Sequence, residues 1–131
     1  MGVRFPSVVT NTVVATPVLT TAELLIATLP PLNLPLDFAT VLILWDVLLN
    51  VGAAGSAITI RIRRGTTLAG ALVQGAAGSD NIITAAQVRR AGFYFDVPGA
   101  VGGQQYSLTA QIANATGNTP VNDVAMLAFV L

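Results

Sequence analysis

Hydrophobic and polar residues alternate with a period of two along much of this chain. The alternation is clearest over residues 58–63, ITIRIR, and over residues 105–112, QYSLTAQI. Successive side chains of a strand point to opposite faces, so this pattern is typical of β-strands with one buried face. In the first stretch the isoleucines share one face, whereas Arg61 and Arg63 share the other.

Turn residues at short intervals separate segments rich in Val, Ile, Thr and aromatic residues, which favours strands throughout. We expect strands at 22–30, 38–51, 58–64, 67–75, 93–97, 104–113 and 124–131. Residues 7–19 fit either an extended arm or a first strand, and Pro17 suggests a sheet edge. The strand at 67–75 is interrupted by Gly70.

Two of the expected strands, 38–51 and 124–131, are apolar on both faces. A strand of this composition is typically covered on both sides. The second one runs to the last residue of the sequence and is expected to pair with a central strand.

Three segments have less regular patterns. Residues 29–37 contain three prolines in nine positions, so no regular ladder is expected there. Residues 76–81 predict a loop. Residues 82–92 fit either a strand followed by a loop or one helical turn.

Eight or nine strands with no strong helix predict an all-β fold. We expect a single antiparallel jelly-roll sandwich or barrel of about eight strands. Residues 1–20 are expected to form an extended N-terminal arm that packs on a neighbour, and residues 21–131 the jelly-roll domain. A parallel α/β fold is excluded because no segment predicts crossover helices.

The scarcity of charged residues bears on the surface of the protein rather than on its fold. Charged residues make up 9% of the 131 residues, against about 25% in an ordinary soluble domain. All six basic residues are arginine, which is enriched at protein interfaces, whereas lysine is depleted there. The simplest interpretation is that much of the surface faces other protein. The alternative is a thermostable monomer, or one coated with Ser, Thr and Asn.

A membrane span is disfavoured despite a mean hydropathy of +0.73. The best candidate, residues 38–58, holds Asp46 near its middle and Asn50 one turn later. A central aspartate costs about 2.5–3.5 kcal/mol on insertion. No membrane partner is therefore expected, and the first residues also lack the layout of a signal peptide.

Catalysis and cofactor binding are equally disfavoured. The chain has no histidine and no cysteine, so it lacks the usual general base, thiolates and the commonest metal ligand. A Ser-His-Asp triad cannot form, and a Ser-Lys pair is excluded because lysine is absent. The carboxylates are scattered, and most lie in turn-like segments. We expect no enzyme activity, no cofactor and no metal site.

The arginines are the remaining candidate functional residues. Arg61 and Arg63 share a strand face, and residues 88–90 supply a second basic cluster. One interpretation is nucleic-acid binding, which is weak because six acids balance six arginines. A second is a solvent-facing row paired with Asp or Glu of the same chain. The third is a subunit interface, where arginine binds a neighbour's carboxylate or carbonyls. The candidate interface residues are Arg4, Phe5, Arg61, Arg63, Arg89 and Arg90.

Three segments resemble small jelly-roll virion structural proteins of bacterial viruses, of the capsid decoration or cement type. They read ITIRIRRGTTLAGALV, GGQQYSLTAQIA and VNDVAMLAFVL, and the resemblance covers residues 38–131. It implies a jelly roll, often trimeric, that coats capsids. Its motifs are strand patterns rather than chemical signatures, and it leaves the N-terminal 35 residues uncovered.

Composition and resemblance together favour a structural virion protein that self-assembles and coats or stabilises a viral capsid. Its expected partners are copies of itself, as a homotrimer, and the viral capsid protein, with no nucleic acid, and its expected location is the capsid surface. One alternative is a capsid-building jelly-roll subunit. An alternative of another class is a secreted module of the tumour-necrosis-factor-like or lectin-like type, which would need a ligand groove lined with aromatics.

Overall fold

The computed structural model describes residues 7–10, 12–13, 16–50, 56–74, 79–82, 87–113 and 119–131. These residues contain twelve strands and no helix. The strands are β1 (Val8–Thr10), β2 (Thr12–Val13), β3 (Leu24–Thr28), β4 (Leu32–Leu34), β5 (Val41–Asn50), β6 (Ser56–Arg64), β7 (Leu72–Gln74), β8 (Ser79–Ile82), β9 (Gln87–Asp96), β10 (Gly102–Gln104), β11 (Tyr106–Ile112) and β12 (Val121–Val130).

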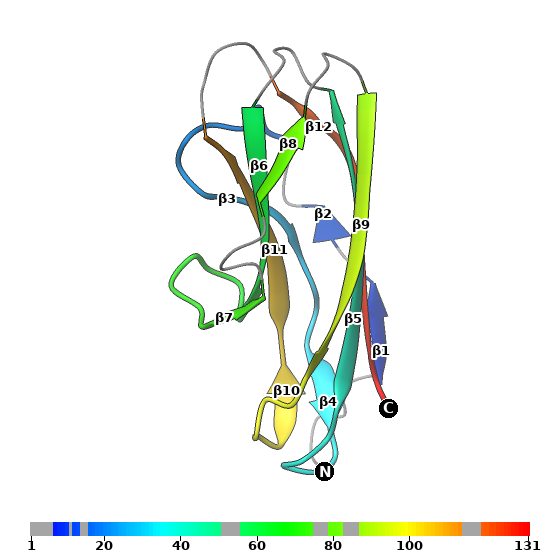
Figure 1. Ribbon diagram of the computed structural model, residues 1–131. Coiled ribbons are helices and arrows are strands. Elements are labelled where there is room, and N and C mark those ends of the chain that lie inside the picture. The colour runs from blue at the N-terminus through cyan, green and yellow to red at the C-terminus, as the bar shows by residue number, and fades with distance from the viewer. Residues whose placement is uncertain are drawn as a thin grey trace.

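Two antiparallel sheets face each other across the core (Figure 1). Sheet A has the order β1-β12-β5-β9, and sheet B the order β2-β3-β11-β6-β7, with β8 also paired to β6. Strands β4 and β10 form a separate pair. The predicted all-β, antiparallel jelly-roll sandwich is confirmed. Twelve strands replace the expected eight or so because six of them have four residues or fewer.

The core forms where the inward residues of the two sheets meet. In β5 the odd-numbered positions Val41, Ile43, Val47 and Leu49 are fully buried, as the period-two pattern predicts. The terminal strand β12 lies between β1 and β5, so the expectation that it pairs with a central strand is confirmed.

The N-terminal segment pairs with this chain's own sheets. β1 pairs with β12 in sheet A, and β2 pairs with β3 in sheet B. Val9 and Leu19 belong to the buried core. Residues 1–6 of the expected arm lie outside the described residues, and packing of the segment on a neighbouring copy stays a prediction.

Several boundaries differ from the sequence expectations. The proline-rich segment 29–37 does contain a strand, because β4 fits between Pro31 and Pro35. Residues 79–81 of the expected loop 76–81 belong instead to strand β8, which ends at Ile82 and pairs with β6. Residues 87–92 of the ambiguous segment 82–92 join residues 93–96 in the single ten-residue strand β9.

The expected strand 67–75 begins late, because residues 65–70 form turns and bends, and of the described part of this segment only Leu72–Gln74 is a strand. A Cβ at Gly70 would lie 1.9 Å from the carbonyl oxygen of Arg64. The turn between β6 and β7 therefore closes tightly at this glycine, and the backbone nitrogen of Arg64 donates to Ala71.

Candidate functional site

Arg61 and Arg63 lie on the outer face of sheet B, as the alternation predicts. The register pairs Arg61 with Thr109 of β11, and Arg63 with Ser107. Ile58 and Ile62 of the same strand point the other way, into the core. We call the outer surface around Glu23, Arg61, Arg63 and Gln111 the arginine face.

Glu23 holds the two arginines together. Its Oε1 accepts a hydrogen bond from Arg61 Nη1 at 2.9 Å, and its Oε2 accepts one from Arg63 Nε at 2.8 Å. Arg63 Nη2 also donates to Glu23 Oε1 at 3.0 Å, so this pair is bidentate. Arg63 Nη1 donates to the carbonyl of Gly70 at 2.9 Å. The arginines are therefore bound to partners of the same chain, which is the second interpretation of the sequence.

These contacts shift the pKa of Glu23. Burial by itself would raise the pKa of Glu23, but the hydrogen bonds and positive charges of Arg63 and Arg61 outweigh it. The pKa of Glu23 is accordingly lowered from its ordinary value of 4.5. Glu23 thus stays ionised at neutral pH.

Two small residues lie among these long side chains. Ser107 and Thr109 are fully buried although they face outward on β11. Their hydroxyl oxygens have no hydrogen-bond partner among the described residues. Their burial matches their position directly opposite Arg63 and Arg61, whose stems cover the strand surface.

Arg64, the third arginine of the strand, belongs to a different cluster that joins the two sheets. Its Nε and Nη2 donate to the two carboxylate oxygens of Asp96 at 3.0 and 2.7 Å. Tyr106 Oη donates to the same carboxylate at 2.8 Å. Asp96 ends β9 in sheet A, whereas Arg64 and Tyr106 belong to sheet B, so we call these three residues the inter-sheet link.

The inter-sheet link also shifts two pKa values. Burial, followed by the hydrogen bond to Asp96 and the charge of that carboxylate, raises the pKa of Tyr106 far above its ordinary value. The hydrogen bond to Asp96 likewise raises the pKa of Arg64. Neither group titrates near neutral pH, so the inter-sheet link is a structural element rather than an acid–base site.

The remaining candidate interface residues do not join the arginine face. Arg89 is on the outer face of sheet A, where its Nη1 donates to Asp46 Oδ1 at 2.7 Å. Arg90, the next residue of β9, points to the opposite face of this sheet and is half-buried, and its Nη1 donates to the carbonyl of Arg89. Arg4 and Phe5 lie outside the described residues. The structure thus places the four described candidates on different surfaces instead of one.

The outer face of sheet A presents a different chemistry. The register aligns two rows of side chains across the strands: Val8, Phe129, Leu42 and Phe95 in the first, and Thr10, Leu127, Leu44 and Phe93 in the second. We call the seven apolar members of these rows the apolar face. Three of them are more than half exposed, namely Phe93 at 61%, Val8 at 56% and Phe95 at 51%.

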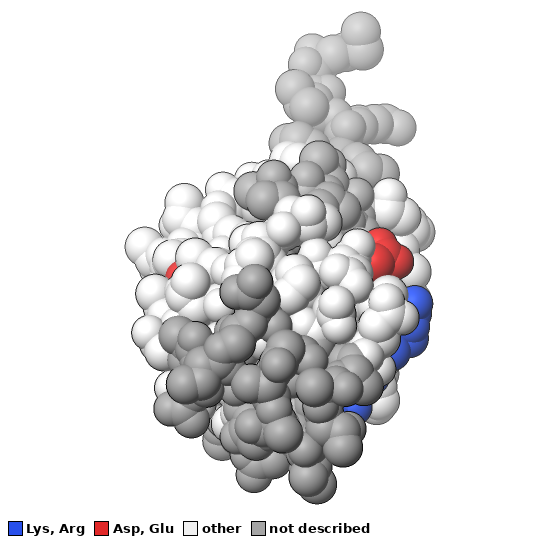
Figure 2. Space-filling view, turned by 90° about the horizontal axis from the view of Figure 1, so that it is seen from above, with Lys and Arg blue, Asp and Glu red and all other residues white. Residues whose placement is uncertain are grey.

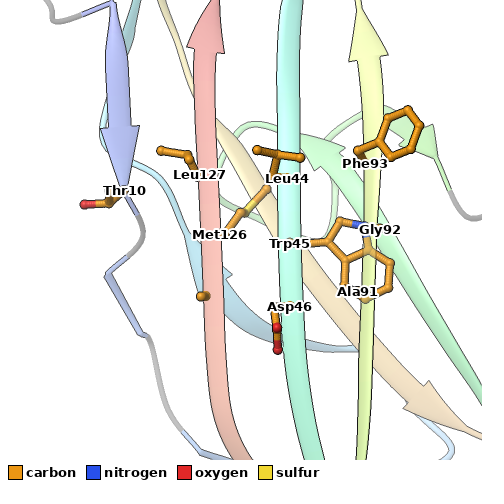
Figure 3. A pocket seen from close by; sticks show the side chains of 10 residues that line it. Thr10, Leu44, Trp45, Asp46, Ala91, Gly92, Phe93, Met126 and Leu127 are labelled. Atoms are coloured by element: carbon orange, nitrogen blue, oxygen red, sulfur yellow. The ribbon is translucent and has the colours of Figure 1, made fainter.

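The two phenylalanines form a projecting pair on this face. Their ring centroids lie 5.9 Å apart with an interplanar angle of 80°, an edge-to-face contact. Beside them lies a shallow hollow, lined by Leu44, Asp46, Ala91 and Leu127 among others (Figure 3). The apolar face therefore carries both a ridge and an adjoining depression.

At the hollow, strands β5 and β9 pack tightly against each other. Gly92 pairs with Trp45, and a Cβ at Gly92 would lie 2.7–3.0 Å from three atoms of the indole ring. The indole therefore occupies the space that a side chain at position 92 would take. Any larger residue there would displace Trp45 from its place against the core.

The sequence interpretation concentrated on the arginines and did not identify the apolar face. Two signals were present. The segment 93–97 alternates, which puts Phe93 and Phe95 on the face opposite Tyr94. The strands 38–51 and 124–131 are apolar on both faces, whereas the structure covers only one face of each in the single chain.

Charged groups occupy little of the surface. Seen from one end, the described part of the molecule shows only small acidic and basic patches on an otherwise uncharged surface (Figure 2). Within the described ranges no group of three or more acidic side chains could hold a metal ion. The same part of the chain contains no helix long and apolar enough to cross a membrane.

No protein-family model matches the sequence, and no curated protein matches it. Solved structures do resemble the fold. A chain of the T13 viral particle of infectious bursal disease virus superposes with a TM-score of 0.66 at 8% identity, over 97% of this chain and 32% of that chain.

Two further structures of infectious bursal disease virus give similar values. The Gx strain superposes with a TM-score of 0.63 at 10% identity, over 95% of this chain and 32% of that chain. The Gt strain gives 0.58 at 11% identity, over 93% and 31%. This chain thus spans about a third of the length of each viral chain, and at these identities the likeness establishes the fold alone.

Proposed function

We propose that this protein is a non-enzymatic structural protein of a virus particle, which assembles with copies of itself and coats or stabilises the capsid from its surface. The observation that carries the proposal is the apolar face. A monomer in water exposes few contiguous apolar patches of this kind, and such patches mark protein contacts. The arrangement fits a protein whose working state is an assembly.

Two further observations support this function. The chain has few charges, and the four ion pairs of the described residues engage four of its six arginines and three of its six acids within the chain. The fold is also the one found in chains of infectious bursal disease virus particles. Both observations agree with a protein that works in contact with other protein chains.

A capsid-building subunit is the second candidate. The same fold likeness favours it, because that likeness is to chains of a viral particle. The two roles differ in what the protein forms by itself. A building subunit closes into shells, whereas a decoration protein forms small oligomers and needs a capsid to bind.

Expression of the protein alone, followed by light scattering and electron microscopy, separates these roles. We expect oligomers of defined size that co-sediment with capsids lacking this protein. The mass gives the number of copies, for which the resemblance implies three. Shells formed by the isolated protein would favour the building role. A 13.5 kDa species that neither self-associates nor binds capsids would overturn both.

A further inference from the structure

We infer that the apolar face, and not the arginine face, is the surface through which a second copy of this chain binds, sheet A against sheet A about a two-fold axis. The inference rests on the proposed function and names the contact used in self-assembly. Its basis is the different state of the two outer surfaces in the single chain.

The arginine face has little left to offer a partner. Both oxygens of Glu23 accept hydrogen bonds from the arginines, and Arg63 also binds the carbonyl of Gly70. The three charged side chains are only 14–19% exposed. A neighbour that bound the Glu23 carboxylate or the arginine nitrogens already bonded to it would have to compete with these contacts.

The apolar face, in contrast, presents exposed apolar side chains. Its two rows carry no charged side chain. The charged residues farther along this face are Asp46 and Arg89, which bind each other, and Asp123, which shares a cross-strand row with Arg89. The two apolar rows of a second identical copy can therefore meet those of the first without opposing charges within the rows. Phe93 and Phe95 are each more than half exposed in the single chain, and their burial in a contact is favourable.

Size and shape agree with a second copy. Four strands about 4.8 Å apart and about ten residues of about 3.3 Å each give the outer face of sheet A an area of at most about 600 Å² in projection. A standard interface buries about 800 Å² of accessible surface per partner, and accessible area exceeds the projection of a side-chain surface. The ridge formed by Phe93 and Phe95 also adjoins a hollow that a partner's ridge can enter. Packed sheets of this kind form ordinary sandwich interfaces.

A two-fold contact uses the same patch on both copies, so the inference predicts an even number of chains in place of the three that the resemblance implies. Replacing both exposed rings, Phe93→Asp with Phe95→Asp, should raise the dissociation constant at least about 100-fold, because buried aromatic anchors dominate interfaces. Leu68→Asp is the matched control. Leu68 is 42% exposed in the turn before β7, away from sheet A, and its replacement should leave assembly unchanged.

Thiol labelling provides a second measurement that does not need a disruptive substitution. The chain has no cysteine, so Phe93→Cys carries the sole thiol. Its reaction with a maleimide should be at least about tenfold slower in the assembled protein than after dilution to monomers. The thiol of Leu68→Cys should react at the same rate in both states.

The outcomes separate the inference from the proposed function. Even-numbered oligomers, a folded monomeric Asp double variant and a protected thiol at position 93 support both. An oligomer with an unprotected thiol at position 93, or one with three chains, overturns the two-fold contact and leaves the proposed function standing. A monomer at 100 µM or so that binds capsids overturns the second copy as occupant. A monomer that binds no capsid overturns the proposed function as well.

Discussion

The outer faces of the two sheets differ in whether their side chains find partners within the chain. Each faces away from the core, yet the two arginines of the arginine face bind Glu23 of the same chain, whereas Phe93 and Phe95 of the apolar face are more than half exposed. A strand face can be completed by its own chain or by another chain. Clustered arginines do not by themselves mark an interface, because an acid of the same chain can bind them.

Loss of the N-terminal segment is the most severe way to break this comparison, because it supplies a strand to each sheet. Deletion of residues 1–20 removes β1, β2 and the buried Val9 and Leu19. Each buried side chain contributes about 1.5–3 kcal/mol, so for the two of them we expect a loss of about 3–6 kcal/mol, measured by urea unfolding. A truncated protein of unchanged stability that only fails to assemble would show that the segment acts as an arm.

The inter-sheet link comes next in size. Asp96→Asn removes the carboxylate that accepts from Arg64 and Tyr106, and should lower the free energy of unfolding by about 3 kcal/mol. Tyr106→Phe removes one hydrogen bond and should cost about 1 kcal/mol. Thermal or urea unfolding measures both. Equal losses for the two variants would mean that the arginine contributes nothing.

The arginine face should matter for the fold and not for assembly. Replacing both Arg61 and Arg63 by threonine leaves the largely buried Glu23 carboxylate without its charged partners, at a cost of about 2 kcal/mol. The oligomer mass should not change. Dissociation of a variant with wild-type stability would instead make this the interface and reverse the comparison.

The pH dependence of the stability that Glu23 contributes is the smallest expected effect. The pKa of Glu23 is lowered on folding, so its contribution to stability is present above its ordinary pKa of 4.5 and is lost as the pH falls through the folded value. Wild type should exceed Glu23→Gln by about 1–2 kcal/mol at pH 6. The difference should shrink progressively below pH 4.5. Unfolding titrations at several pH values measure it, and a pH-independent difference would contradict the assigned ion cluster.

The alternation of apolar and polar residues was sufficient to predict the class of fold. Period-two patterns over 58–63 and 105–112 gave strands β6 and β11 with the correct faces inward. The pattern also put Arg61 and Arg63 together, because successive side chains alternate by geometry alone. For residues 82–92 the pattern fitted either a strand followed by a loop or one helical turn, since short apolar runs fit several structures.

Only the tertiary structure decided which residues meet. Glu23 lies about forty positions before the arginines that it binds, and Asp96 lies 32 positions after Arg64, so no local pattern connects them. Phe93 and Phe95 become a surface feature only when β9, β5, β12 and β1 align in one register. Local alternation fixes the face on which a side chain lies, because that is a property of the strand. Pairing between distant strands fixes its partners, because the sheet brings them together.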